Sequence, residues 1–114
     1  MTGSQSPSGR FEITISAWEA RMSLWIETPT LLDRHSNEAI LVFQDPNWSL
    51  DSATWTSDAT VVLTLRKYPG NHRPTSLVAT VDATARTATV EGTTVPLTAL
   101  ESLLDEQLTW IHAH

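Results

Sequence analysis

The chain has 114 residues, of which 40% are apolar, and it contains no cysteine. This length suits a single domain with a real core, and the lack of cysteine excludes disulfides, thiol catalysis and zinc sites built on cysteine. The net charge is −6, from 7 Lys and Arg against 13 Asp and Glu, so the surface repels nucleic-acid phosphates and we expect no nucleic-acid partner.

The N-terminal stretch "MTGSQSPSGR" is polar and has no apolar core of a secretory signal. No run approaches the ~18 apolar residues that a membrane span needs. We therefore expect a soluble cytoplasmic protein without a membrane partner. The acidic surface favours attraction to a basic partner. Mild acidity without a specific role is the alternative.

In chain order, residues 1–9 read as a disordered tail and residues 10–114 as a single globular domain. Apolar and polar residues alternate over 11–17, which predicts a half-buried strand. A second alternating run covers 22–27, and Pro29 is expected to end it. The residues between the two runs form either a turn or a bulge in one long bent strand.

The continuous apolar run "AILVFQ" predicts a strand buried on both faces, followed by a turn at "DPNW" and a short strand in "SATWTS". Three further segments alternate and are separated by short connections, with a tight reversal at Gly92. These segments, 60–68, 76–82 and 87–91, predict an antiparallel meander.

The last element is predicted to be a helix. Thr98 and Glu101 fit a capping box, in which each side chain bonds the other residue's backbone N–H. Leucines then recur at helical spacing, and we expect this stripe to pack on the sheet as core. The predicted fold is α+β: an antiparallel β-sheet, with a sandwich or half-barrel as the variant, and one C-terminal helix packed on it. The stripe consists of Leu100, Leu103, Leu104, Leu108 and Ile111.

No catalytic or cofactor motif is present, so we expect no enzyme and no cofactor. Asp45 and Asp51 flank Trp48 and suggest an acidic pair beside a pocket, with turn residues that bond their own backbone as the favoured alternative. His112 and His114 form a His-x-His pair without further ligands at usable spacing, so we expect no metal site.

The five tryptophans are many for a chain of this length. Tryptophan provides an interface anchor or a sugar platform, but it also fills cores. Trp25 is the best candidate for exposure, because it lies on the polar side of its own strand pattern. The other four are Trp18, Trp48, Trp55 and Trp110.

The stretch "LRKYPGNHRP" concentrates basic residues in an acidic chain. Arg66, Lys67 and Arg73 are three of the seven Lys and Arg residues, and Tyr68 adds an aromatic ring. Such a loop suits an acidic partner, whereas the alternative is charge that protects an exposed strand edge. The partner-binding candidates are thus Trp25, Arg66, Tyr68, His72 and Arg73.

Two segments, "FQDPNWSLDSATWTSDATVVLTLRKYPGNH" and "ATVDATARTATVEGTTVPLTALESLLD", resemble small proteobacterial proteins and cover about half of the chain. Small, acidic, cysteine-free proteins of this kind look like the immunity proteins encoded beside bacterial toxins. The resemblance implies a non-catalytic module that binds one cognate toxin and occludes it. It carries over no catalytic residue.

Two other classes of function stay open. One is a β domain that binds a small molecule or a carbohydrate through exposed tryptophans, and the other is a structural subunit of a larger assembly. A concave aromatic pocket favours the first of these, and a self-complementary apolar patch favours the second. The pattern leaves the oligomeric state and the strand order undetermined.

Overall fold

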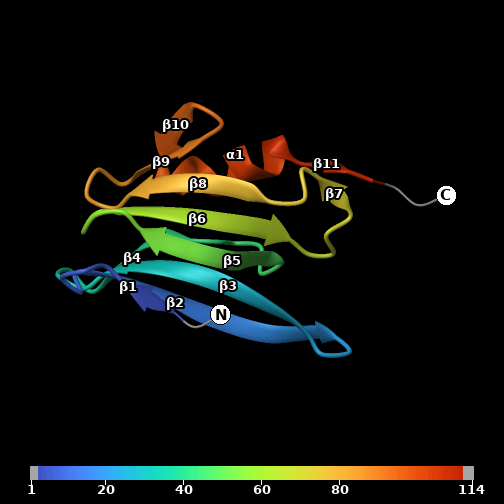
Figure 1. The fold of residues 1–114 in the computed structure, drawn as a ribbon, viewed down its shortest axis with the longest axis horizontal. Coiled ribbons are helices and arrows are strands. Elements are labelled where there is room, and N and C mark those ends of the chain that lie inside the picture. The colour runs from blue at the N-terminus through green and yellow to red at the C-terminus, as the bar shows by residue number, and fades with distance from the viewer. Residues whose placement is uncertain (1–2, 112–114) are drawn as a thin grey trace.

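A computed structural model describes residues 3–111, and antiparallel strands dominate it (Figure 1). The predicted class, α+β with mainly antiparallel sheet and one C-terminal helix, is confirmed. The first sheet has the order β1-β2-β3-β4. Its strands are β1 (Ser4–Gln5), β2 (Phe11–Arg21), β3 (Leu24–Asp33) and β4 (Glu38–Val42).

The second sheet has the order β10-β9-β8-β6-β5, and the small pair β11-β7 lies beside it. The predicted meander is confirmed, because β6, β8 and β9 follow one another as antiparallel neighbours. Its strands are β5 (Trp48–Trp55), β6 (Thr60–Lys67), β8 (Leu77–Asp82), β9 (Thr87–Val90) and β10 (Thr93–Pro96). The pair consists of β7 (His72–Arg73) and β11 (Thr109–Trp110).

The two sheets meet where β3 runs beside β5 (Figure 1). The backbone N–H of Glu27 donates to Ser49 Oγ at 3.1 Å, and Thr28 Oγ1 donates to the Pro46 carbonyl at 2.8 Å. The helical segment, η1 (Leu97–Ala99) followed by α1 (Leu100–Gln107), contacts β4 on one side and β9 and β10 on the other. The helical segment thus lies between β4, an edge strand of the first sheet, and β10, an edge strand of the second.

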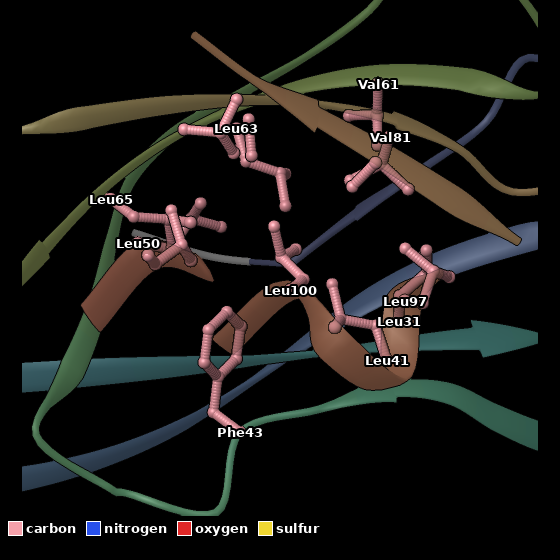
Figure 2. Close-up of a cluster of buried hydrophobic side chains, with 14 of the residues drawn as sticks. Leu31, Leu41, Phe43, Leu50, Val61, Leu63, Leu65, Val81, Leu97 and Leu100 are labelled. Carbon is pink, nitrogen blue, oxygen red and sulfur yellow. The ribbon is translucent and has the colours of Figure 1, made fainter. Parts of the chain in front are cut away.

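The core fills the space between the sheets and the helix. β6 alternates strictly, burying Val61, Leu63 and Leu65, and Leu97 and Leu100 reach the same cluster from the helical segment (Figure 2). Period-two alternation thus places one face of the sheet in the core. Of the predicted leucine stripe, Leu100, Leu103 and Leu104 are buried.

The expectation of a disordered tail is wrong for residues 3–9. Ser4 and Gln5 pair with Ile13 and Glu12 of β2. Ser6 is buried, donates its N–H to the Phe11 carbonyl and accepts the Phe11 N–H on its Oγ. The low apolar content misled the prediction, because hydrogen bonds rather than apolar burial hold this segment.

Pro29 does not end its strand. β2 and β3 form one long hairpin, and Met22 and Ser23 make its turn with φ of 44° and 71°. Both values are positive, as in the two-residue turns that suit a twisted hairpin. β4 pairs with β3 only from Thr30 onward. The missing backbone N–H of Pro29 therefore removes no hydrogen bond between β3 and β4. A bulge lies between Glu19 and Arg21.

Two other expectations need correction. β4 is not buried on both faces: it is an edge strand, and Ala39 and Val42 are exposed. The capping box does not form either, because the Glu101 carboxylate instead accepts the backbone N–H groups of Gln44 and Asp45, at 2.7 and 2.9 Å. α1 ends at Gln107, so the predicted stripe loses its last turn.

Candidate functional site

Three of the five predicted binding residues come together at one end of the molecule. Trp25 on β3, Arg66 on β6 and Tyr68 in the following loop line a hollow of about 70 Å³, together with Leu24 and the Pro69–Gly70 turn. Chain segments about 40 residues apart in sequence thus share one surface. The long β2–β3 hairpin supplies one wall, and the end of β6 supplies the other.

Hydrogen bonds and a ring contact fix the hairpin against the loop. Trp18 Nε1 donates to the Pro46 carbonyl at 3.0 Å, and the Tyr68 N–H donates to the Asn47 carbonyl at 2.8 Å. The rings of Trp18 and Tyr68 meet edge to face with centroids 6.2 Å apart. Such a geometry is favourable for aromatic pairs, so the wall of the hollow is built in advance of any binding.

The hairpin tip exposes an apolar cluster. The exposed fractions are 92% for Met22, 40% for Leu24 and 54% for Trp25. The β2–β3 register runs without a shift from Phe11↔Asp33 to Glu19↔Trp25, so Trp25 lies on the same strand face as the buried Leu31. Trp25 is exposed because the hairpin continues past the end of the core. The prediction of its exposure is confirmed.

Sequence reasoning missed Met22 and Leu24. The signal was present, since Met22 stands at the junction of two alternating runs. The alternating pattern predicts that Met22 starts a strand, and a residue in such a strand is normally half-buried. The hairpin turn instead carries Met22 to the point farthest from the core.

Arg66 lies at the rim of the hollow. Its side chain is 55% exposed, and its Nε bonds Asp51 Oδ1 at 3.0 Å. Asp51 occupies a register shift in β5 between Leu50 and Ser52, which leaves it outside the regular pairing. The pair holds the guanidinium plane while leaving other N–H donors for a partner.

Lys67 points the other way and is not part of this surface. Its side chain is only 13% exposed, and Nζ bonds Asp105 at 2.7 Å and Asp45 at 3.0 Å while lying 5.3 Å from the Trp48 ring centroid. Burial alone would lower the pKa of Lys67, but the hydrogen bonds to Asp105 and Asp45 outweigh it and raise the pKa. The lysine therefore ties β6 to α1 as a permanent cation.

His72 lies inside the protein, contrary to its selection as a binding residue. It is 1% exposed, and its Nδ1 lies 2.7 Å from the Pro74 carbonyl oxygen. Its Nε2 lies 3.0 Å from the Lys67 carbonyl oxygen and 3.3 Å from the Lys67 backbone nitrogen. Trp110 of β11 covers it, with ring centroids 5.0 Å apart. The spacing of the loop gives no sign of this, because the covering strand lies about 40 residues away.

Arg73 is exposed on β7, opposite Thr109 of β11. It does not line the hollow that Trp25, Arg66 and Tyr68 share. The basic stretch thus divides into three parts: Arg66 and Tyr68 at the hollow, Lys67 and His72 inside, and Arg73 on a separate surface.

The candidate acidic pair separates in the same way. Asp45 bonds Lys67 and accepts the Asn47 N–H at 2.9 Å, which is the turn role favoured as the alternative, and Asp51 bonds Arg66. Among residues 3–111 no group of three or more His, Cys, Asp or Glu is placed to hold a metal ion. His112 and His114 lie outside this range. None of the helices described for these residues is long and apolar enough to cross a bilayer.

Comparison of the chain with protein-family models, with curated proteins and with solved structures gave no match.

Proposed function

We propose that this chain is a protein-binding module that recognises its partner through the β2–β3 hairpin tip. The observation that carries the proposal is the cluster of Met22, Leu24 and Trp25, exposed beside Tyr68 and Arg66. Exposed apolar clusters rimmed by polar groups mark interaction sites. Tryptophan, tyrosine and arginine are also the residues that dominate binding energy in protein interfaces.

The size of the hollow favours a protein partner over a small molecule. Ligand pockets usually enclose about 300–1,000 Å³, whereas the hollow at Trp25 encloses about 70 Å³. A protein partner does not need a deep pocket, because it contacts the raised side chains of Met22 and Leu24 as well as the hollow. The carbohydrate alternative has no comparable support.

The more specific form of the proposal is an immunity-type protein that neutralises a cognate bacterial toxin by covering it. The resemblance of residues 43–72 and 79–105 suggested this role, and the net charge of −6 supports attraction to a basic partner surface. The chain acts by occlusion in this account and carries out no chemistry.

The test uses the tagged chain as bait in extracts of the organism that encodes it. The tip variant combines Met22→Ser with Trp25→Ser. Its matched control is Val78→Ser, because Val78 is 50% exposed on β8 in the other sheet. We expect one stoichiometric partner with wild type and Val78→Ser, and its loss with the tip variant. Equal recovery by both variants contradicts the proposal, as does the absence of any partner at high bait concentration.

The immunity form needs a second experiment. We expect the captured protein to be toxic when it is expressed alone and harmless when it is expressed with the wild-type chain. The tip variant should fail to protect. If the captured protein is not toxic, the immunity form of the proposal is contradicted. The chain would then be a binding module of another kind, such as a subunit of an assembly.

A further inference from the structure

We propose that the hollow beside Trp25 and Arg66 takes the carboxylate of one Asp or Glu side chain of the partner. The inference rests on the proposed function and names the chemical group that the hairpin tip recognises. The hollow encloses about 70 Å³, so it admits a single side chain rather than a segment of main chain. Its lining combines one positive charge with several hydrogen-bond donors, and both suit an anion.

The charge of the hollow comes from Arg66. Among residues 3–111 it is the only charged residue in the lining, and its side chain is 55% exposed, so a partner can reach it. Asp51 faces Nε at 3.0 Å, and no second acidic residue pairs with Arg66 in the described part of the chain. A guanidinium carries five N–H donors in a planar fork, so a carboxylate at Nε leaves the Nη groups to bond a second one.

Three further residues of the lining carry side-chain donors. Ser49 is 6% exposed and its Oγ accepts the Glu27 N–H at 3.1 Å, which leaves the hydroxyl hydrogen to be donated. The Tyr68 hydroxyl and Trp25 Nε1 have no hydrogen-bond partner within residues 3–111. A carboxylate accepts hydrogen bonds from all of these groups, whereas an ammonium group would face the positive charge of Arg66.

The rest of the lining is apolar and consists of Leu24, Ile26 and the Pro69–Gly70 turn. Apolar walls exclude water, so an ion pair between them is stronger than one in bulk solvent. The same walls make a charge costly unless it is paired and hydrogen-bonded. A partner without a carboxylate at this point would dehydrate the Arg66 guanidinium without giving it a second acceptor. The hollow therefore discriminates between partners.

The charge of the hollow is opposite to that of the whole chain, which has a net charge of −6. Around the hairpin turn, Arg21 and Glu19 of β2 carry opposite charges and neither lines the hollow. The overall charge attracts a basic surface over a distance, and the hollow then requires an acidic side chain within that surface. Since a basic surface carries few carboxylates, the two requirements together define a narrower class of partner than either does alone.

The first measurement is made on the captured partner. A water-soluble carbodiimide and an amine convert accessible Asp and Glu side chains to amides, and mass spectrometry compares the free partner with the complex. We expect the wild-type complex to protect at least one carboxylate of the partner. Arg66→Gln should weaken binding by about ten- to a hundredfold. The matched control, Arg73→Gln, should bind like wild type, because Arg73 is exposed but does not line the hollow.

A charge swap then tests the pair itself. The protected carboxylate of the partner is replaced by lysine, and Arg66→Glu is combined with Asp51→Asn so that two carboxylates do not meet in the chain. We expect the combined variant to lose the native partner and to regain at least about tenfold in affinity with the lysine form, because the pair is restored with reversed sign. Asp51→Asn alone is the control, and urea unfolding shows that each variant is folded.

A wild-type complex that protects no Asp or Glu of the partner overturns the proposal without any variant, and a swap that restores no affinity overturns it too. If Arg66→Gln binds like wild type while the tip variant loses the partner, the hollow is excluded and recognition through the tip stands. The free chain is labelled in the same way. A protected carboxylate other than Asp51 that Arg66→Gln makes reactive would show that the chain fills its own hollow, which also contradicts the proposal.

Discussion

Trp18 and Tyr68 meet edge to face, with ring centroids 6.2 Å apart, and this contact joins the β2–β3 hairpin to the loop after β6. Each residue is also anchored to the turn before β5, through Pro46 for Trp18 and Asn47 for Tyr68. Three separate segments are thus locked together beneath the exposed tip. We infer that the tip keeps its geometry without a partner, which lowers the entropic cost of binding.

The first prediction concerns this ring pair. A double-mutant cycle with Trp18→Phe and Tyr68→Leu should give a coupling energy of about 0.5–1.5 kcal/mol, the usual range for aromatic pairs. The cycle separates the ring contact from the hydrogen bond of Trp18 Nε1, which each Trp18 variant loses alike. Urea unfolding of the four proteins measures it. Strictly additive effects would mean that the rings do not stabilise one another.

The second prediction compares two neighbouring cations of β6. Lys67→Met leaves Asp45 and Asp105 without their shared cation, so it should lower the free energy of unfolding by about 1–3 kcal/mol. The matched control, Arg66→Met, breaks an exposed pair with Asp51 and should cost about 0–1 kcal/mol. Urea unfolding of both variants decides. An equal effect of the two would show that Lys67 does not secure α1.

The third prediction tests the structural role of His72. His72→Ala leaves the Pro74 carbonyl and the Lys67 N–H without their bonds and opens a cavity under Trp110, so it should cost about 2–4 kcal/mol. Arg73→Ala, at the neighbouring exposed position, should stay within about 0.5 kcal/mol. Thermal and urea unfolding measure both. If His72→Ala were as stable as wild type but lost the partner, His72 would be a binding residue after all.

The fourth prediction concerns acid. Hydrogen bonds from the Ser8 hydroxyl and N–H lower the pKa of Asp58 below 3.8. Burial of Asp45 favours a higher pKa, but the Asn47 N–H and Lys67 outweigh it, so its pKa is lowered as well. A carboxyl whose pKa is depressed on folding stabilises the fold above its unfolded pKa and loses that effect as the pH falls through the folded pKa.

The free energy of unfolding should therefore fall as the pH decreases below about 4. Asp58→Asn should make this fall shallower, because it removes one of the carboxyls that must be protonated. Glu106→Gln is the control, since Glu106 has no bonded partner in the described residues. Urea unfolding between about pH 2 and 7 is the measurement. Identical pH profiles for wild type and Asp58→Asn would contradict the assigned role of Asp58.

Much of the fold follows from local patterns. The β6-β8-β9 meander was predictable because Val61, Leu63 and Leu65 alternate and short turns follow. The order of the remaining strands was not, because β4, β5 and the helix meet only through contacts between distant segments. The prediction for Pro29 failed for the same reason. A proline interrupts a strand only where its missing N–H would have bonded a neighbouring strand, and the residues near Pro29 do not show that the pairing with β4 stops at Thr30.

The site was predictable in part. Trp25, Arg66 and Tyr68 were selected separately, one from a strand pattern and two from a basic loop, and the structure places them around one hollow. Local pattern failed for His72, which is buried by Trp110, and for Met22, which is exposed by a turn. A strand distant in sequence decides the environment of His72, and the hairpin turn decides that of Met22.

The most direct test of the central claim is the affinity of the captured partner for Trp25→Ser, measured by isothermal titration calorimetry beside wild type and Val78→Ser. Trp25 is 54% exposed and no core contact depends on it, so the variant should stay folded. We predict a loss of about 2–4 kcal/mol in binding free energy for Trp25→Ser, as for anchor residues of other interfaces, and no change for Val78→Ser. An affinity of Trp25→Ser equal to that of wild type would contradict recognition through the hairpin tip.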